Sequence, residues 1–123
     1  MGKDYLTEKV IGCAIEVHRQ LGPGLLESSY ERCLLYELAE AEIDARAQVF
    51  LPVEYKGMIL DAGYRIDILI PGQLVLELKS AEKLLPIHTA QMLTYLKLSG
   101  IKKGLLINFN ESKLINGLKR VVL

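Results

Sequence analysis

Residues 65–79, RIDILIPGQLVLELK, decide the fold because two strongly apolar runs flank a short turn. Pro71-Gly72-Gln73 has the composition of a turn, and each flanking run has the length and residue types of a β-strand. If the turn comprises these residues, Ile70 pairs with Leu74, and the remaining pairs follow by counting outward. This register predicts one wholly apolar face, on which Ile70, Ile68 and Ile66 lie opposite Leu74, Leu76 and Leu78.

The other face of this hairpin carries charge. Here Leu69 meets Val75, Asp67 meets Glu77, and Arg65 meets Lys79. Two carboxylates directly opposite each other have Cβ atoms only ~5 Å apart, and like charges in that position are destabilising. On a solvated face, Arg65 and Lys79 would offset the repulsion. On a covered face, the pair is typical of an oxygen-ligand site for Mg²⁺ or Mn²⁺, and Lys79 could reach a water or phosphate beside the ion.

The rest of the chain predicts helices before the hairpin and a helix and a strand after it. Apolar spacing indicates helices over 7–20, with Thr7 as N-cap, and over 25–41. A strand over 47–53 and a Lys56-Gly57 turn into 58–60 precede the strands 64–70 and 74–79. A helix over 86–98 and a strand over 103–109 follow, and the tail from Ser112 forms a short helix or a last strand. The order α-α-β-β-β-β-α-β predicts an α/β or α+β domain with a mixed sheet, a single domain over 1–123.

Composition limits the class of protein. Half of the residues are hydrophobic, which excludes a disordered chain, and the two cysteines are too few for a disulfide framework. Fifteen basic and fifteen acidic residues cancel, so bulk charge does not favour binding to nucleic acid, although a local basic patch would. We expect a cytoplasmic protein, because no signal peptide or transmembrane run is evident.

Further polar side chains face the same region of the predicted domain. At 100° per residue, Glu27 lies almost in line with Leu34 and Leu38, and Glu31 follows one turn later. Glu27 is either a first-turn carboxylate favoured by the helix dipole or a group at a metal site. Gln91 and Tyr95 share a helix face, where they could position a phosphate or hydrogen-bond ligating carboxylates, although Tyr95 could equally be packed in the core. We interpret His18 and His88 as structural.

Three motifs resemble the PD-(D/E)XK nuclease superfamily. Asp67 followed by Glu77-Leu78-Lys79 resembles its D…ExK motif, and Gln91 with Tyr95 resembles the QxxxY motif of its recombination-exonuclease branch. Gly24, Glu27 and Tyr30 match the pattern that names its small GxxExxY family. The segments EVHRQLGPGLLESSYE, LDAGYRIDILI and LPIHTAQMLTYLKLSGIKKGLLINFN are also similar to that family, so the resemblance extends over about residues 6–120.

The resemblance implies a restriction-endonuclease-like core, with a central mixed β-sheet flanked by helices, that hydrolyses phosphodiester bonds of nucleic acid, above all DNA. It implies that Asp67, Glu77 and the backbone carbonyl of Leu78 hold Mg²⁺ (or Mn²⁺), and that Glu27 completes or supports the site. Lys79 would orient or deprotonate the attacking water, and Gln91 would support Lys79 or the phosphate. The supporting residues would be Tyr95, Tyr30 and Glu31.

Two other functions remain open. The first is a non-catalytic module that binds nucleic acid or protein and retains the nuclease fold, which the zero net charge favours. In this case a partner protein or a homodimer would supply what the small neutral domain lacks. The second is a dimeric junction-resolving or repair nuclease, whose symmetry would supply a longer basic surface. Metal binding without cleavage would indicate the first, and a preference for branched DNA would indicate the second.

Overall fold

The computed structural model describes residues 4–61 and 63–123. Within them it has the helices α1 (Tyr5–Leu21), α2 (Glu27–Glu40) and α3 (Pro86–Ser99) and a short 3₁₀ helix, η1 (Leu114–Gly117). The strands are β1 (Arg46–Phe50), β2 (Val53–Tyr55), β3 (Met58–Leu60), β4 (Arg65–Ile70), β5 (Leu74–Lys79), β6 (Lys103–Asn108) and β7 (Leu118–Val122). No helix in this part of the chain is long and apolar enough to cross a membrane.

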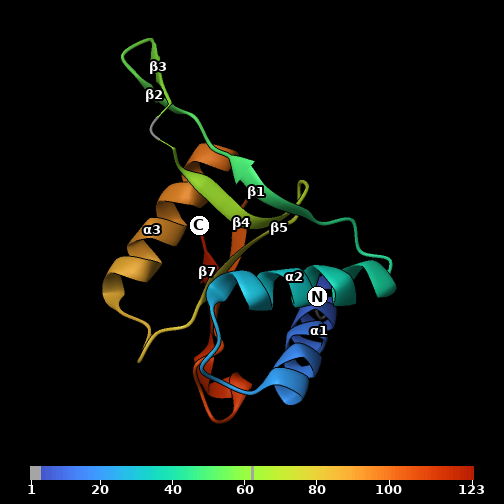
Figure 1. Cartoon of the computed structure of the whole chain (residues 1–123). Coiled ribbons are helices and arrows are strands. Elements are labelled where there is room, and N and C mark those ends of the chain that lie inside the picture. Colours follow the sequence, from blue (N-terminus) through green and yellow to red (C-terminus); the bar gives the residue numbers. More distant parts are fainter. Residues whose placement is uncertain (1–3, 62) are drawn as a thin grey trace.

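The main sheet is five-stranded, with the strand order β1-β4-β5-β6-β7. Only β5 and β6 pair in parallel, and α3 connects them; the other neighbours are antiparallel. Helices α1 and α2 cover one face of this sheet and α3 covers the other (Figure 1). The α+β class with a mixed sheet, consistent with a restriction-endonuclease-like core, is therefore confirmed.

The predicted register of the central hairpin is confirmed for the three pairs next to the turn. Ile70 pairs with Leu74, Leu69 with Val75, and Ile68 with Leu76. Beyond these pairs the regular ladder ends, and the strands continue toward Asp67 and Glu77. The turn chemistry and the apolar alternation were therefore sufficient to fix the pairing next to the turn, but not that of the strand ends.

One face assignment is wrong. Ile66, Ile68 and Ile70 were predicted to share one face, but only Ile68 and Ile70 pack with α1 and α2, whereas Ile66 packs in the cluster under α3, together with Leu51 and Val75. The reason is a local irregularity, because the β1–β4 pairing skips both Gln48 and Asp67, and Gln48 has a left-handed backbone with φ 53°. An interrupted ladder changes the twist of a strand. Asp67 therefore lies at the point of β4 where the buried side chains change from the α1–α2 side of the sheet to the α3 side.

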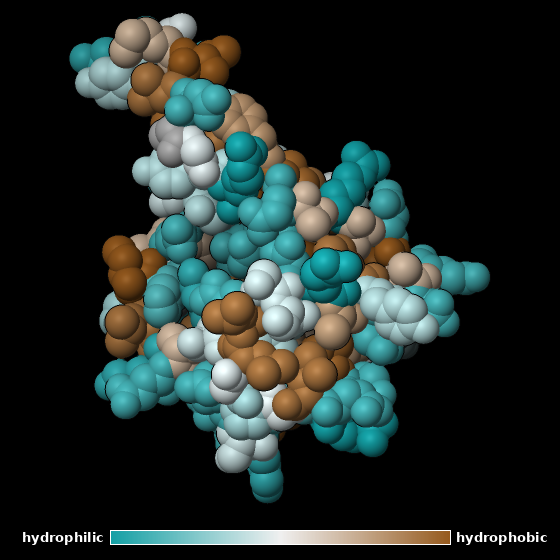
Figure 2. Space-filling model, viewed as in Figure 1, coloured by the Kyte–Doolittle hydropathy of each residue, from teal (hydrophilic) through white to brown (hydrophobic). Residues whose placement is uncertain are grey.

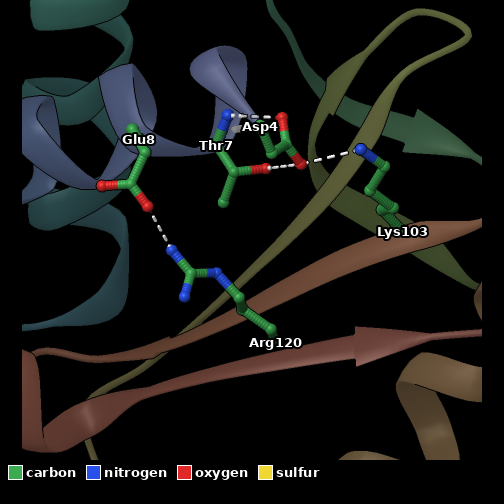
Figure 3. Close-up of polar contacts among 5 residues, drawn as sticks. All are labelled: Asp4, Thr7, Glu8, Lys103 and Arg120. Atoms are coloured by element: carbon green, nitrogen blue, oxygen red, sulfur yellow. Dashed lines mark hydrogen bonds and ion pairs between the residues drawn. The ribbon is translucent and has the colours of Figure 1, made fainter. Parts of the chain in front are cut away.

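Several element boundaries also differ from the predictions. Helix α1 begins at Tyr5, because Asp4 and not Thr7 is the N-cap. Asp4 accepts hydrogen bonds from the Thr7 amide at 3.2 Å and the Thr7 hydroxyl at 2.7 Å, and also binds Lys103 (Figure 3). Arg120 pairs with Glu8 in the same region, so α1 is joined to β6 and β7.

The predicted strand over 47–53 is two strands, because the chain leaves the main sheet at Leu51 and Pro52. The second of them, β2, forms a separate hairpin with β3 around the predicted Lys56-Gly57 turn. The tail forms both elements that were considered as alternatives, η1 and then β7. The described order therefore has two more strands than predicted.

Candidate active site

Asp67 on β4 and Glu77 on β5 lie beside each other where the hairpin ladder ends. The backbone amide of Asp67 donates to Glu77 Oε2 at 2.9 Å, and the amide of Leu78 donates to Asp67 Oδ2 at 2.8 Å. Each carboxylate thus accepts a bond from the other strand, in place of a regular backbone pair. The predicted juxtaposition of these two side chains is present, and it is fixed by the backbone of both strands.

The surroundings of this pair disfavour two negative charges. Glu77 is only 4% exposed, and its pKa is raised from 4.5 to about 8, first by burial and then by the charge of Asp67. Burial also raises the pKa of Asp67, and the charge of Glu27 adds to this. Because burial penalises a charge that has no counterion, the pair would gain most from a cation placed between the carboxylates.

The donor set fits a small divalent cation. Among the described residues, no donor forms a hydrogen bond with Glu77 Oε1. Every fully buried side-chain oxygen or nitrogen in this part of the chain has a hydrogen-bond partner, so Glu77 Oε1 is not fully buried and reaches solvent. Carboxylate oxygens are the ligands that Mg²⁺ and Mn²⁺ prefer. Across residues 4–61 and 63–123, however, no three His, Cys, Asp or Glu side chains are grouped closely enough to hold a metal. Any ion here would need a backbone carbonyl, waters or a substrate oxygen as well.

Lys79 ends β5, two residues after Glu77. It is half-buried, and its positive charge lowers the pKa of both Asp67 and Glu77 against the larger effect of burial. Its backbone carbonyl accepts a hydrogen bond from the Phe109 amide at 2.9 Å, which fixes the end of the strand. The positive charge of Lys79 is thus close enough to act on both carboxylates electrostatically.

Glu27 is the first residue of α2 and points toward the end of β5. Its Oε2 accepts a hydrogen bond from the Ser80 amide at 3.3 Å, while the Ser80 hydroxyl donates to the Leu25 carbonyl at 2.7 Å. Its charge raises the pKa of both Asp67 and Glu77, so it acts on the pair electrostatically. The structure therefore places Glu27 at the rim of the site, with a hydrogen bond to the residue that directly follows β5.

Tyr30 is fully buried and stacks on Phe109, with ring centroids 4.3 Å apart. Its hydroxyl donates to the Gly22 carbonyl at 2.6 Å and accepts from the Leu25 amide at 3.1 Å. These bonds fix the loop that leads into α2, and therefore the position of Glu27. Glycine suits this loop because Gly24 has φ 96°, a left-handed conformation.

Glu31 lies on the same side of the site. Its Oε1 accepts from the Gln48 amide nitrogen at 2.7 Å, and its pKa is raised by burial and also by the charge of Asp67. The Gln48 amide favours the charged form of Asp67 as well. Gln48 therefore lies between the two acids.

Helix α3 contributes Gln91 and Tyr95, whose side chains are joined by a 3.1 Å hydrogen bond from the amide to the phenol oxygen. Burial raises the pKa of Tyr95, and the charges of Glu77 and Asp67 raise it further. Tyr64, just before β4, meets the Tyr95 ring edge-on at 6.5 Å between centroids. Tyr95 therefore lies close enough to the acidic pair to feel its charge, Gln91 is linked to the pair through Tyr95, and Tyr95 is also part of the core.

Sequence reasoning missed four contributors: Gln48, Tyr64, Ser80 and Asn108. Asn108 is fully buried and bonds both the amide and the carbonyl of Ala81, which holds the loop after Lys79. A polar residue inside an otherwise apolar strand was a usable signal for Gln48 and Asn108. The histidines are structural as interpreted, since His18 binds the Glu111 carbonyl and His88 accepts from the Leu85 amide at the start of α3.

One of three comparisons with known proteins gives a match, and that match is to a superfamily. A family model described as the PD-(D/E)XK nuclease superfamily matches residues 4–121. Neither the curated proteins nor the solved structures contain a match. The matched region includes every helix and strand described above, apart from the last residue of β7, and the whole acidic pair with its surroundings. On this evidence the chain belongs to the PD-(D/E)XK nuclease superfamily.

Proposed function

We propose that this chain is a metal-dependent nuclease that hydrolyses phosphodiester bonds of DNA, as a single nuclease domain over residues 1–123. The observation that carries the proposal is the buried Asp67–Glu77 pair, held across β4 and β5 with Lys79 directly after it. Gly24, Glu27 and Tyr30 lie together at the start of α2, which supports placing the chain in the GxxExxY family.

The ligands in this proposal are Asp67, Glu77 and the backbone carbonyl of Leu78, with Glu27 at the rim as a further or supporting carboxylate. Mg²⁺, or Mn²⁺ in its place, would supply a Lewis acid for the charge that develops on the scissile phosphate. The raised pKa of Glu77 supports this assignment, because a bound cation is what would let both acids ionise at neutral pH.

The protein's own groups would orient the reactants. Lys79 would orient the attacking water, which suits a positive charge close to two carboxylates, or would deprotonate it after first losing its own proton. Gln91 would position Lys79 or the phosphate, and its bond to Tyr95 would fix the amide. Tyr30 would hold the loop before Glu27, and Glu31 would hold Gln48 next to Asp67. By analogy with the superfamily, in-line attack would leave a 5′-phosphate.

Cleavage assays on linear and branched DNA with Mg²⁺ or Mn²⁺ test this function. Glu77→Ala and Lys79→Ala should each abolish cleavage while the chain stays folded by circular dichroism. The exposed Lys119→Ala and Glu40→Gln are matched controls that should cut at the parental rate. If both site variants still cut at that rate, the assignment is wrong.

The zero net charge favours one other candidate, a non-catalytic binding module with the same fold. A neutral chain has little long-range attraction for a polyanion. Metal binding without cleavage of any DNA or RNA would support this candidate. A strong preference for branched over linear DNA would instead support a dimeric junction-resolving or repair nuclease.

A further inference from the structure

The β2–β3 hairpin (residues 53–60) projects away from the rest of the molecule, as Figure 1 shows. Its strands form their own sheet and do not join the five-stranded one. All six strand residues are exposed or half-buried. An isolated two-stranded hairpin is marginally stable in water by itself, so a partner surface would stabilise it.

The pairing of the two strands makes the hairpin two-faced. Tyr55 lies opposite Met58 and Val53 opposite Leu60, which places these four apolar residues on one face. The other pair, Glu54 and Ile59, lies on the opposite face. Tyr55, Met58 and Leu60 are all exposed, and the space-filling view shows apolar surface on this projection (Figure 2).

The apolar face continues into a groove at the foot of the hairpin. The groove measures about 510 Å³, and it is lined by Val53 and Tyr64 and, from α3, by Ile87, Gln91, Tyr95 and Leu98 among others. None of its described lining residues is an Asp, Glu, Lys or Arg. Ile87 is 66% exposed, and Leu98 and Tyr64 are also exposed.

We propose that this surface is a homodimer interface, in which the hairpin of each copy lies in the groove of the other. The chain carries a projecting apolar face and an apolar groove side by side, which is the self-complementarity that a twofold interface requires. The hairpin has one acidic and one basic residue, Glu54 and Lys56, and the chain has no net charge, so two copies do not repel each other. The same neutrality makes nucleic acid the less suitable occupant.

The available area is sufficient for such an interface. Six large apolar side chains of the hairpin face and the groove are exposed: Tyr55, Met58, Leu60, Tyr64, Ile87 and Leu98. At on the order of 100 Å² for each half-exposed side chain, they offer roughly 600 Å² per copy, at the lower end of the ~600–1,000 Å² per partner of a standard interface. The interface would also cover the outer side of Gln91 and Tyr95, which line the groove.

Light scattering coupled to size exclusion, run without metal or nucleic acid, tests the proposal independently of any nuclease activity. The parent should form a dimer that dissociates on dilution, and Met58→Glu and Ile87→Lys should each be monomeric with unchanged circular dichroism. Ile59→Glu, on the opposite hairpin face, and Ile115→Glu should stay dimeric because both residues lie outside the proposed interface, and they are matched controls because their exposed fractions, 74% and 65%, are close to the 66% of Ile87.

Mixing the two monomeric variants gives the sharpest result. Met58→Glu mixed with Ile87→Lys should restore a heterodimer, because opposite charges meet in one half of the interface and the other half is unchanged. Met58→Lys mixed with Ile87→Lys should stay monomeric. A parent that is monomeric at every concentration, or a mixture that does not recover, overturns the proposal. The proposal is also overturned if the parent is monomeric and Met58→Glu lowers the affinity of the protein for single-stranded DNA, because the apolar face would then bind nucleic acid.

Discussion

Asp4 and Glu77 are both carboxylates that accept backbone hydrogen bonds, yet their surroundings act on them in opposite directions. Asp4 caps α1 beside Lys103, and the pKa of Asp4 is lowered to about 2, first by the bond to Lys103 and then by Thr7 (Figure 3). Glu77 is buried next to another acid, and its pKa is raised to about 8. The first site already contains its counterion, whereas the second still requires one. Carboxylates whose pKa is strongly raised by burial and by a neighbouring acid are typical of functional sites.

The largest expected effect comes from removing both charges of the acidic pair. Asp67→Asn combined with Glu77→Gln should eliminate Mg²⁺ and Mn²⁺ binding in calorimetry and lower any cleavage rate on the order of 10³-fold or more. Asp4→Asn, which removes a carboxylate that already has its cation, should leave both quantities unchanged. If the parent and the double variant bind the cations equally, the acidic pair does not need a cation, and the contrast between Asp4 and Glu77 fails.

The second largest effect is expected on the free energy of unfolding of the metal-free protein. The folded-state pKa of Glu77, about 8, lies above its ordinary value of 4.5, so the unfolded chain loses this proton first as the pH rises. The free energy of unfolding should therefore fall between these two pH values, by at most about 1.4 kcal/mol per pH unit from this group, and level off above them. Glu77→Gln should flatten that part of the profile.

Thermal melts between pH 5 and pH 9 would measure this dependence. Adding Mg²⁺ at pH 8 should raise the melting temperature of the parent and leave that of Glu77→Gln unchanged, because only the parent gains a counterion for the ionised acid. A parent profile that rises across this range in the presence of a chelator would contradict the burial argument.

A smaller effect is expected from Glu27, whose charge acts on the pair from the rim. Glu27→Gln should lower the pKa of Glu77, because one negative neighbour is removed; the loss of stability in the metal-free protein should still begin near pH 4.5 but should end at lower pH and be smaller in total. Cation affinity should fall by about 10-fold, as is usual when a supporting group is removed. Glu40→Gln, on the exposed end of α2, is the control.

The sequence was sufficient to predict the acidic pair because short-range rules determine it. The Pro71-Gly72-Gln73 turn and the alternation around it leave one register for β4 and β5, and that register brings Asp67 next to Glu77. The position of Glu27 followed from helical periodicity in the same way, since the angle between helix residues is fixed.

Long-range contacts account for what could not be predicted. The face change at Ile66 depends on the irregular pairing of Gln48, which belongs to a different strand. The cap of α1 depends partly on Lys103, a residue 99 positions further along the chain. Local preference also allowed Thr7 as the cap, because Thr and Asp both occupy that position readily.

The smallest expected effect concerns Asp4. Asparagine caps helices about as well as aspartate, so Asp4→Asn should lose only the exposed ion pair with Lys103 and cost a few tenths of a kcal/mol at neutral pH. The pKa of Asp4 is lowered from 3.8 to about 2, so its contribution is present above pH 3.8 and is lost as the pH falls through that interval. Urea titrations at neutral pH and near pH 2 should therefore show the parent and Asp4→Asn converging in acid. A gap that widens in acid, or a change in cation affinity in this variant, would show that Asp4 does more than hold α1 against β6.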